Sequence, residues 1–248
     1  MKVKELLSFL NARFPLNLAC DFDNVGLLVG NENSEITGVL VALDCTSKAI
    51  EKAKENGFNL IVTHHPVIFN PQKQILANDL VYKLIKNDIS VISLHTNLDT
   101  ADGGVNDVLA EVLELKNVKK LVCEDGFTIR IGELLNETSA DDFAKYISQK
   151  LGTSVKYCGE NQIKRVALCS GNGGEFFSLA TENGADAFVT AECKHHLFLL
   201  AEEKGVFLAD AGHFNTEDIV VEPLAKVIKE CNLKVLTFHH SPIKECKV

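Results

Sequence analysis

Short apolar segments alternate with amphipathic helical segments along most of this 248-residue chain. The strands predicted from apolar runs are 39–43, 60–62, 89–94, 166–169, 206–208 and 235–238. The helices predicted from helical spacing are 3–14, 48–56, 80–87, 106–115, 140–151, 175–183 and 221–231. Strands and helices that alternate at these lengths are typical of βαβ units. The sequence therefore predicts an α/β protein with largely parallel sheets.

The second half of the chain resembles the first. When the sequence is shifted by 127 residues, segment 36–63 aligns with segment 163–190 without a gap, and Glu55-Asn-Gly57 meets Glu182-Asn-Gly184. We interpret this as two similar α/β halves, residues 1–122 and 123–248, that arose by duplication. The last segment, from about 213 to 248, is the part that would pack back on the N-terminal half. The alternative, that all βαβ units look alike, stays open.

Composition and charge exclude some classes of function. The formal net charge of −9 argues against generic nucleic-acid binding, which depends on Lys and Arg that neutralise phosphates. The N-terminus is charged and amphipathic, and no apolar run reaches the ~20 residues that cross a bilayer. None of the eight cysteines forms a Cys-x-x-Cys pair. We therefore predict a cytoplasmic protein with reduced thiols and no membrane partner.

The apolar run Leu60–Val62 ends in Thr63, His64, His65 and Pro66. Proline cannot donate to a sheet ladder, so the strand must stop there, with two imidazoles at its end. Ligand sites of open α/β sheets lie beyond the carboxyl ends of strands, and histidine is the commonest metal ligand. We expect a divalent-metal site in which His64 and His65 are ligands. The alternative is a pair of histidines that only makes hydrogen bonds.

Three further residues complete the candidate ligand set. His213 and Glu217 are four residues apart, so they share one face if a helix begins near residue 212. Asp99 follows its own predicted strand. Together with His64 and His65 they exceed what one tetrahedral zinc needs, and a bridging carboxylate would hold two ions about 3.5–4 Å apart. The predicted cofactors are two divalent ions per subunit, with Zn, Mn, Fe, Ni and Co all compatible with ligands that include no thiolate.

The remaining histidines carry less definite predictions. His195 and His196 lie just beyond a predicted strand and are candidates for the catalytic acid or base, with supporting or surface roles as alternatives. His95 precedes Asp99 and could orient a ligand or a substrate. The pair at 239 and 240 is interpreted as structural.

Several motifs, taken in chain order, resemble one known family. They are Thr63-His-His-Pro66, Leu94-His-Thr-Asn-Leu-Asp99, Gly103-Gly-Val-Asn106, Lys194-His-His196 and Gly212-His-x-x-x-Glu217. The family is that of the GTP cyclohydrolase 1 type 2 homologues, the NGG-interacting-factor-like proteins, and segment 23–30 resembles its N-terminal signature. Three positions depart from its pattern: Phe22 stands where Trp is common, Ala191-Glu192 replaces Gly-Asp, and Phe214 replaces a frequent Tyr. The chain also lacks the domain that some members carry between the halves.

The resemblance implies two α/β halves with a dinuclear metal site in the cleft between them, and a ring-shaped homohexamer. It implies ligand roles for His64, His65, Asp99, His213 and Glu217. The expected activity is a metal-dependent hydrolase of the GTP cyclohydrolase type, with GTP as the small-molecule substrate. Water would attack C8 of the guanine imidazole ring, formate would leave, and dihydroneopterin triphosphate would form.

Within that mechanism, His195 or His196 would move protons to and from the ring nitrogens. Lys194 or the turn at 171–174 would meet the triphosphate. Two alternatives stay open: a metal-dependent hydrolase of another small phosphorylated or damaged metabolite, and a non-enzymatic metal-binding or interaction ring protein.

Overall fold

The computed structural model of the protein describes residues 1–124 and 126–244. The chain divides into two compact units. Unit 1 consists of Met1–Ala101 together with the chain from Val220 on, and unit 2 consists of Asp102–Ile219. The predicted boundary at residues 122 and 123 therefore falls inside unit 2, and the segment that returns to the first unit begins at Val220.

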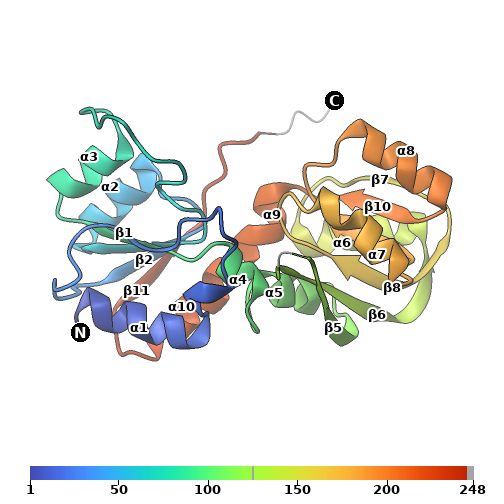
Figure 1. Ribbon diagram of the computed structural model, residues 1–248, viewed down its shortest axis with the longest axis horizontal. Coiled ribbons are helices and arrows are strands. Elements are labelled where there is room, and N and C mark those ends of the chain that lie inside the picture. The colour runs from blue at the N-terminus through green and yellow to red at the C-terminus, as the bar shows by residue number, and fades with distance from the viewer. Residues whose placement is uncertain (125, 245–248) are drawn as a thin grey trace. The chain divides into compact units, whose positions relative to one another are not determined.

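Unit 1 is built around a mostly parallel sheet whose strands lie in the order β1, β4, β3, β2, β11. The strands are β1 (Gly26–Val29), β2 (Val39–Ala42), β3 (Leu60–Thr63), β4 (Ser90–Ser93) and β11 (Val235–Phe238). The helices are α1 (Val3–Arg13), η1 (Leu16–Leu18), α2 (Ser47–Glu55), α3 (Leu80–Lys86), α4 (Thr96–Thr100) and α10 (Val221–Lys229). Only β1 runs antiparallel to its neighbour in this part of the described chain. Helices α2 and α3 cover one face of the sheet, and α1 and α10 cover the other (Figure 1).

The central strands of unit 1 are apolar because both of their faces are covered. Every residue of β2, β3 and β4 is buried, which is the pattern expected for parallel strands between two layers of helices. Helix α2 begins where the hydroxyl of Thr46 accepts a hydrogen bond of 3.1 Å from the backbone N–H of Ala49. Pairing of β11 with β2 brings the end of the chain into this sheet.

Unit 2 contains a mixed sheet in the order β5, β6, β8, β9, β10, β7. The strands are β5 (Lys116–Val122), β6 (Thr128–Ser139), β7 (Lys156–Cys158), β8 (Gln162–Leu168), β9 (Ala187–Thr190) and β10 (Phe207–Asp210). The helices are α5 (Val105–Val112), α6 (Ala140–Leu151), η2 (Gly174–Phe176), α7 (Phe177–Glu182), α8 (His195–Lys204) and α9 (His213–Glu217), and η3 (Asp218–Val220) spans the boundary at residue 219. Strands β8, β9 and β10 are parallel, and the strands outside them pair antiparallel.

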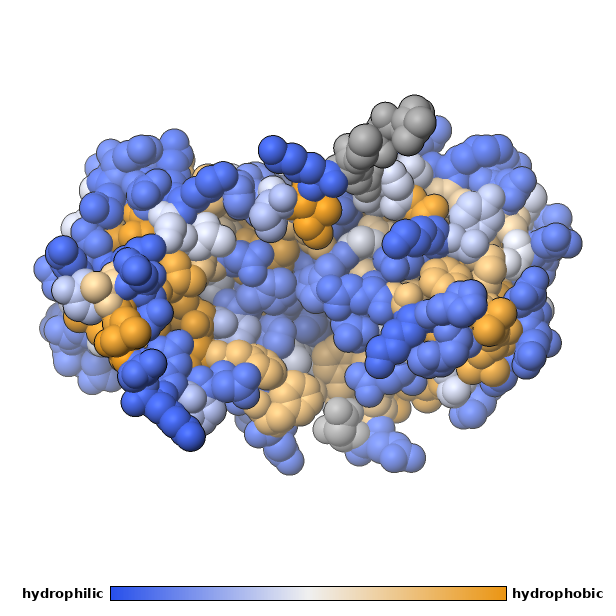
Figure 2. Space-filling view, turned by 90° about the horizontal axis from the view of Figure 1, so that it is seen from above, coloured by the Kyte–Doolittle hydropathy of each residue, from blue (hydrophilic) through white to orange (hydrophobic). Residues whose placement is uncertain are grey.

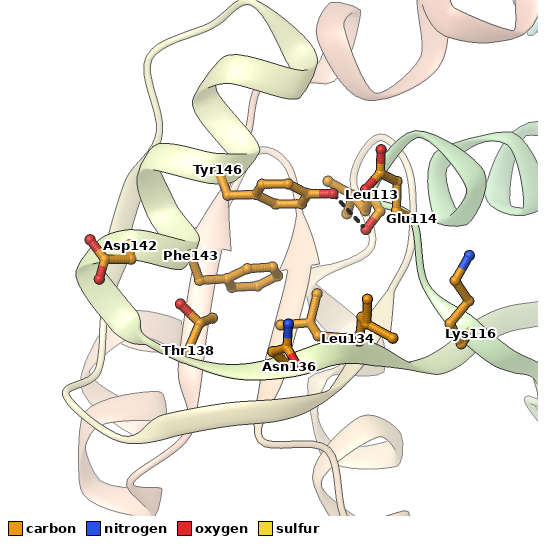
Figure 3. Close-up of a pocket in the computed structure, with 10 residues that line it drawn as sticks. Leu113, Glu114, Lys116, Leu134, Asn136, Thr138, Asp142, Phe143 and Tyr146 are labelled. Carbon is orange, nitrogen blue, oxygen red and sulfur yellow. Dashed lines mark hydrogen bonds between the residues drawn. The ribbon is translucent and has the colours of Figure 1, made fainter.

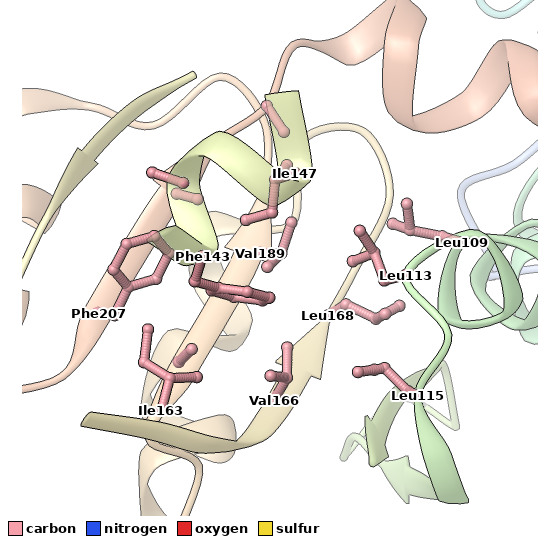
Figure 4. Packing of buried hydrophobic residues seen from close by; sticks show 14 of the residues in the cluster. Leu109, Leu113, Leu115, Phe143, Ile147, Ile163, Val166, Leu168, Val189 and Phe207 are labelled. Atoms are coloured by element: carbon pink, nitrogen blue, oxygen red, sulfur yellow. The ribbon is translucent and has the colours of Figure 1, made fainter. Parts of the chain in front are cut away.

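The core of unit 2 lies between α6 and the parallel strands (Figure 4). Ser139 caps α6 by accepting a hydrogen bond from the backbone N–H of Asp142. The ring of Phe143 on α6 is fully buried and lies 5.4 Å from the ring of Phe207 on β10. Truncation of such a buried ring to Ala typically costs about 3–5 kcal/mol. This packing anchors α6 to the sheet of unit 2.

The predicted internal repeat is also present in the register of the sheets. In unit 1, Val39 on β2 pairs with Leu60 on β3. In unit 2, Val166 on β8 pairs with Ala187 on β9, and both residues are shifted by the same 127 positions. Both units therefore contain the same strand–helix–strand element, and the prediction of an α/β fold with two sheets is confirmed. Among the residues that the structure describes, none of the helices has the length and apolarity of a membrane span.

Candidate functional site

A cluster of histidines lies at the carboxyl ends of the parallel strands of unit 1. His64 directly follows β3 and only 1% of its surface is exposed. Its Nδ1 lies 2.8 Å from the backbone carbonyl oxygen of Leu94. A carbonyl oxygen can only accept, so Nδ1 carries the proton, and in the neutral form of the ring Nε2 is the nitrogen that carries the lone pair.

The two other imidazoles of this cluster are held in the same way. Nδ1 of His65 lies 2.8 Å from Oδ1 of Asp44, and Nδ1 of His95 lies 2.9 Å from Oδ1 of Asp23. A carboxylate accepts from each Nδ1–H, so in the neutral form of each ring Nε2 is the nitrogen that carries the lone pair. One ring nitrogen from each of His64, His65 and His95 lies within 4.8 Å of the others.

Asp99 belongs to the same cluster. It lies on α4, the short helix that follows β4, and its side chain is largely buried. Its Oδ1 is 3.6 Å from Nε2 of His64. Unit 1 therefore brings together three of the predicted residues, His64, His65 and Asp99, and it adds His95, which the sequence interpretation placed outside the ligand set.

Asp23 fixes the position of His95 from a buried site. Burial alone would raise the pKa of this carboxyl group, but hydrogen bonds from His95 and Thr96 outweigh that effect and lower the pKa to about 2. The hydroxyl and the backbone N–H of Thr96 donate to Oδ2 of Asp23 at 2.5 and 3.0 Å. Asp23 is therefore ionised at neutral pH and holds the ring of His95 firmly.

Unit 2 carries a second cluster at the equivalent edge of its own sheet. His213 is the first residue of α9, and its Nε2 lies 2.9 Å from Oε2 of the buried Glu217 one turn later. The predicted spacing of four residues therefore does place both side chains on one helix face. On the other side of the ring, Nδ1 lies 3.1 Å from Oε1 of Glu192.

The turn after β8 makes room for this second cluster. Gly171 has a φ of +58°, and a Cβ atom at this position would lie 2.0 Å from Oε1 of Glu217 and 3.3 Å from Nε2 of His213. The backbone N–H of Gly171 donates to the hydroxyl of Thr216 on α9 at 3.1 Å. Glycine is thus required at position 171 because α9 approaches the turn so closely. Helix α7, which follows the turn, has only six residues and is too short to bind an anion at its N-terminus.

His195 and His196 open helix α8 and are both exposed. His196 lines a polar pocket of about 330 Å³ in unit 2, together with Asn172, Gly174, Glu175, Glu192, Lys194 and Leu197. Glu192 connects this pocket with the cluster, because the same side chain contacts His213. His196 and Lys194 are therefore placed to meet a polar small molecule, and His195 lies outside this lining.

The histidines near the C-terminus occupy a different environment in unit 1. Nε2 of His239 lies 3.3 Å from a carboxylate oxygen of Glu222. The ring of His240 stacks on Phe238 at a centroid distance of 6.0 Å, and its Nε2 lies 2.8 Å from Nζ of Lys48. These contacts join the end of the chain to the surface of its own unit.

Another pocket of unit 2, of about 440 Å³, has a different lining (Figure 3). Phe143 and Tyr146 project into it from α6, and Leu113, Glu114, Lys116, Leu134, Leu135, Asn136, Thr138 and Asp142 complete the wall. This lining contains no histidine and shares no residue with either cluster. We therefore do not place the predicted chemistry in this pocket, although it is well formed.

The donor sets of both clusters fit divalent metal ions. Imidazole nitrogens and carboxylate oxygens are the ligands that Zn, Mn, Fe, Ni and Co share. The hydrogen bonds of Leu94, Asp44 and Glu192 to the ring Nδ1 atoms are of the kind that usually orients metal-binding histidines. Sequence reasoning missed Asp44 and Asp23 as such partners, although Asp44 follows a predicted strand as the histidines do.

The two clusters occupy corresponding positions in the two units. In unit 1, β4 is followed by two residues and the five-residue helix α4, which carries Asp99. In unit 2, β10 is followed by two residues and the five-residue helix α9, which carries His213 and Glu217. Glu192 follows β9 at the position that His65 occupies after β3. The two units thus carry their candidate ligands at the same edge of similar sheets, as the interpretation of the chain as two similar halves predicts.

The fold and these clusters define a class of protein: a two-unit α/β protein with candidate metal-binding groups at the carboxyl ends of its strands. Residues 1–245 match the model of the Duf34/NIF3 (NGG1p interacting factor 3) family. The chain belongs to this family.

Individual relatives are similar over nearly their whole length. A protein of Clostridium perfringens named GTP cyclohydrolase 1 type 2 homolog is 37% identical over 241 residues, which cover 93% of this chain and 92% of the relative. A protein of the same name from Campylobacter jejuni is 34% identical, with 95% of each chain covered. The crystal structure of a hypothetical protein of Staphylococcus aureus superposes with a TM-score of 0.92 at 33% identity, with 99% of each chain covered. The superposition with the S. aureus protein shows that the two chains share one fold.

Proposed function

We propose that the protein is a hydrolase that depends on two divalent metal ions and opens the imidazole ring of a guanine nucleotide, as in the GTP cyclohydrolase reaction. The proposed ligands are His64, His65 and Asp99 from unit 1, and His213 and Glu217 from unit 2. The observation that most supports this proposal is the fixed tautomer of the histidines in unit 1. Because each Nδ1 is held by an oxygen atom, each ring presents Nε2 without any rearrangement.

Two divalent ions bound there would lower the pKa of a coordinated water toward neutrality and polarise the atom that it attacks. The residues of the chain have separate tasks. Glu217 supplies a buried carboxylate, and its contact with His213 fixes the direction of both groups. His95 lies beside His64 and His65 and, in this proposal, positions the substrate.

Proton transfer and phosphate binding are assigned to the polar pocket of unit 2. His196, which lines the pocket, donates a proton to the ring nitrogen that leaves C8, and His195 is the second candidate for this role. Lys194 meets the triphosphate as a point charge. The turn at 171–174 is the second candidate for this contact, because Asn172 and Gly174 line the same pocket.

The test is turnover of GTP by the purified protein, loaded in turn with Zn²⁺, Mn²⁺, Fe²⁺, Ni²⁺ and Co²⁺. Formate release and a pterin that fluoresces after oxidation are expected with at least one metal. His196→Ala should lower kcat by about 10²–10⁴-fold if this residue transfers a proton, while His239→Ala is the matched control and should leave the rate unchanged. Metal-loaded protein that forms neither product contradicts the assignment to GTP.

A second candidate is a hydrolase of another small phosphorylated metabolite, which uses the same metal ligands. The lysine and histidine of the polar pocket favour phosphate in general and carry no feature that selects guanine. A screen of phosphorylated metabolites with the same metal-loaded protein separates this candidate from the first. The third candidate is a non-enzymatic metal-binding or interaction protein, which predicts metal content without turnover of any substrate.

The assembly of the protein is also a proposal. We propose a homohexameric ring, and sedimentation of the purified protein tests it. A mass six times that of one chain is expected, and a stable monomer contradicts the ring.

A further inference from the structure

A series of aromatic rings leads from the buried histidine of unit 1 to its surface. The ring centroids of His64 and His95 are 5.2 Å apart, and those of His65 and His95 are 5.8 Å apart. Phe69 meets His95 edge-on at 6.1 Å, and Phe22 lies 6.4 Å from Phe69. Each ring is thus within the distance at which aromatic side chains interact.

The two phenylalanines at the outer end of this series are unusually exposed. The exposed fraction of the residue is 66% for Phe22 and 44% for Phe69. The face drawn in Figure 2 carries hydrophobic patches between hydrophilic side chains. A single exposed apolar residue needs no explanation, but a pair that continues an ordered series of imidazoles is a candidate binding surface.

The backbone on both sides of this pair is held in place. The side-chain amide of Asn24 donates to the carbonyl oxygen of Ile68 at 2.6 Å, which joins the segments that carry Phe22 and Phe69. Asp23, between Phe22 and Asn24, accepts the hydrogen bond from His95. The position of the aromatic pair is therefore coupled to the position of the histidine cluster.

We propose that Phe22 and Phe69 bind the planar heteroaromatic ring of the substrate, a purine base, by stacking at the outer edge of the histidine cluster. This inference rests on the proposed function, because it assigns the base-binding part of the same site. Phenylalanine has no hydrogen-bonding group, so the pair selects a flat ring and leaves the choice among bases to other residues. The imidazole series then brings the bound ring next to His95.

The chain contains no tryptophan, which makes a direct test simple. The variant Phe22→Trp carries a single tryptophan at the proposed binding surface, and its fluorescence reports contact with a bound base. Metal-loaded F22W is titrated with guanosine, GTP and tripolyphosphate. We expect saturable quenching by guanosine and GTP and none by tripolyphosphate, which has no ring. Absence of quenching by guanosine and GTP overturns the proposal.

A second measurement compares the affinity for GTP of variants that carry no introduced tryptophan. The double variant Phe22→Ala, Phe69→Ala should bind GTP about 5- to 150-fold more weakly for each stacking phenylalanine that is removed, and its metal content should be unchanged. Tyr82→Ala is the matched control, because it removes an aromatic ring from the surface of the same unit, where Tyr82 is 40% exposed. An unchanged affinity in the double variant overturns the proposal. A change of oligomeric state with unchanged affinity assigns the pair to a contact between copies of the chain.

Failure of this inference and failure of the proposed function give different results. Quenching by GTP without formate release supports base stacking on Phe22 and Phe69 and contradicts the cyclohydrolase activity. Formate release without quenching supports the activity and contradicts the stacking.

Discussion

Replacement of Gly171 by Ala is expected to remove metal without unfolding unit 2. An added Cβ would lie 2.0 Å from Oε1 of Glu217, whereas ordinary contacts begin at 3.4 Å, so the carboxylate must move by about 1.4 Å. Distances in metal sites are tolerated within only about 0.2 Å. The displaced oxygen therefore no longer serves as a ligand, and we expect the affinity for the metal to fall by at least about 100-fold.

Gly171→Ala should also lower the free energy of unfolding. Alanine at a left-handed φ costs about 1–2 kcal/mol, which corresponds to a decrease in Tm of about 2–8 °C for a protein of this size. Gly152→Ala is the matched control, because its φ of +63° is similar and a Cβ there would meet nothing within 4 Å. Both variants should lose similar stability, and only Gly171→Ala should lose metal.

Metal content by elemental analysis, affinity by competition with a chromophoric chelator and Tm by calorimetry in the presence of EDTA measure these effects. A folded Gly171→Ala variant that binds metal as tightly as the wild type would contradict the role of the displaced carboxylate. Loss of metal from Gly152→Ala to the same extent would also contradict it, because the effect would then follow from backbone strain alone.

Three further changes test other parts of the site. Glu192→Gln removes the charge that faces Nδ1 of His213, so the affinity for metal should fall about 10–100-fold while Tm stays constant, as chelator competition and calorimetry will show. Asp23 has a folded-state pKa of about 2, below its ordinary 3.8, so its stabilisation is complete above pH 4 and is lost as the pH falls toward 2. Urea unfolding of metal-free protein should therefore show that the stability difference between wild type and Asp23→Asn is about 1 kcal/mol smaller at pH 3 than at pH 6, and a constant difference contradicts the assignment. Arg130→Met leaves Asp107 without its buried cation, so we expect a loss of about 3 kcal/mol and a Tm lower by about 6–12 °C, and a Tm within about 2 °C of wild type would disprove this role.

The parts of the fold that sequence reasoning predicted are those with a simple apolar pattern. Strands β2, β3 and β4 are buried on both faces and consist of largely unbroken apolar runs. Strand β5 was missed because it lies at the edge of its sheet, where nearly all of its residues are exposed, and four of its seven residues are Lys or Asn. Strand β6 was missed because its alternation includes Arg130, a charged residue that is fully buried beside Asp107.

Helix α8 was missed for a different reason. Its sequence from His195 to Lys204 contains a compact apolar run, but only Leu197 and Ala201 are buried. Two buried positions one turn apart give a weak periodic signal, and the exposed Leu199 obscures it. The left-handed Gly205 that ends the helix was the available signal.

The candidate metal ligands could be predicted because they follow strand ends. The residues that hydrogen-bond to the histidine rings could not be predicted. His64 and His65 stand out because Pro66 stops the strand at their position. Asp23 supports His95 across 72 residues, a distance along the chain that no spacing rule connects. The likeness of segments 36–63 and 163–190 is a long-range signal in the sequence, but it ends before α4 and α9, so their equivalent positions after β4 and β10 appear only in the structure.

The proposed metal ligands come from unit 1 and from unit 2, and the metal content of protein purified without chelators shows whether they bind divalent ions. We predict about two ions per chain in the wild type and in His239→Ala. His65→Ala and Glu217→Ala should each remain folded and lose metal. Wild-type protein that is folded but takes up no Zn, Mn, Fe, Ni or Co, or variants that keep the full complement of ions, would contradict the claim.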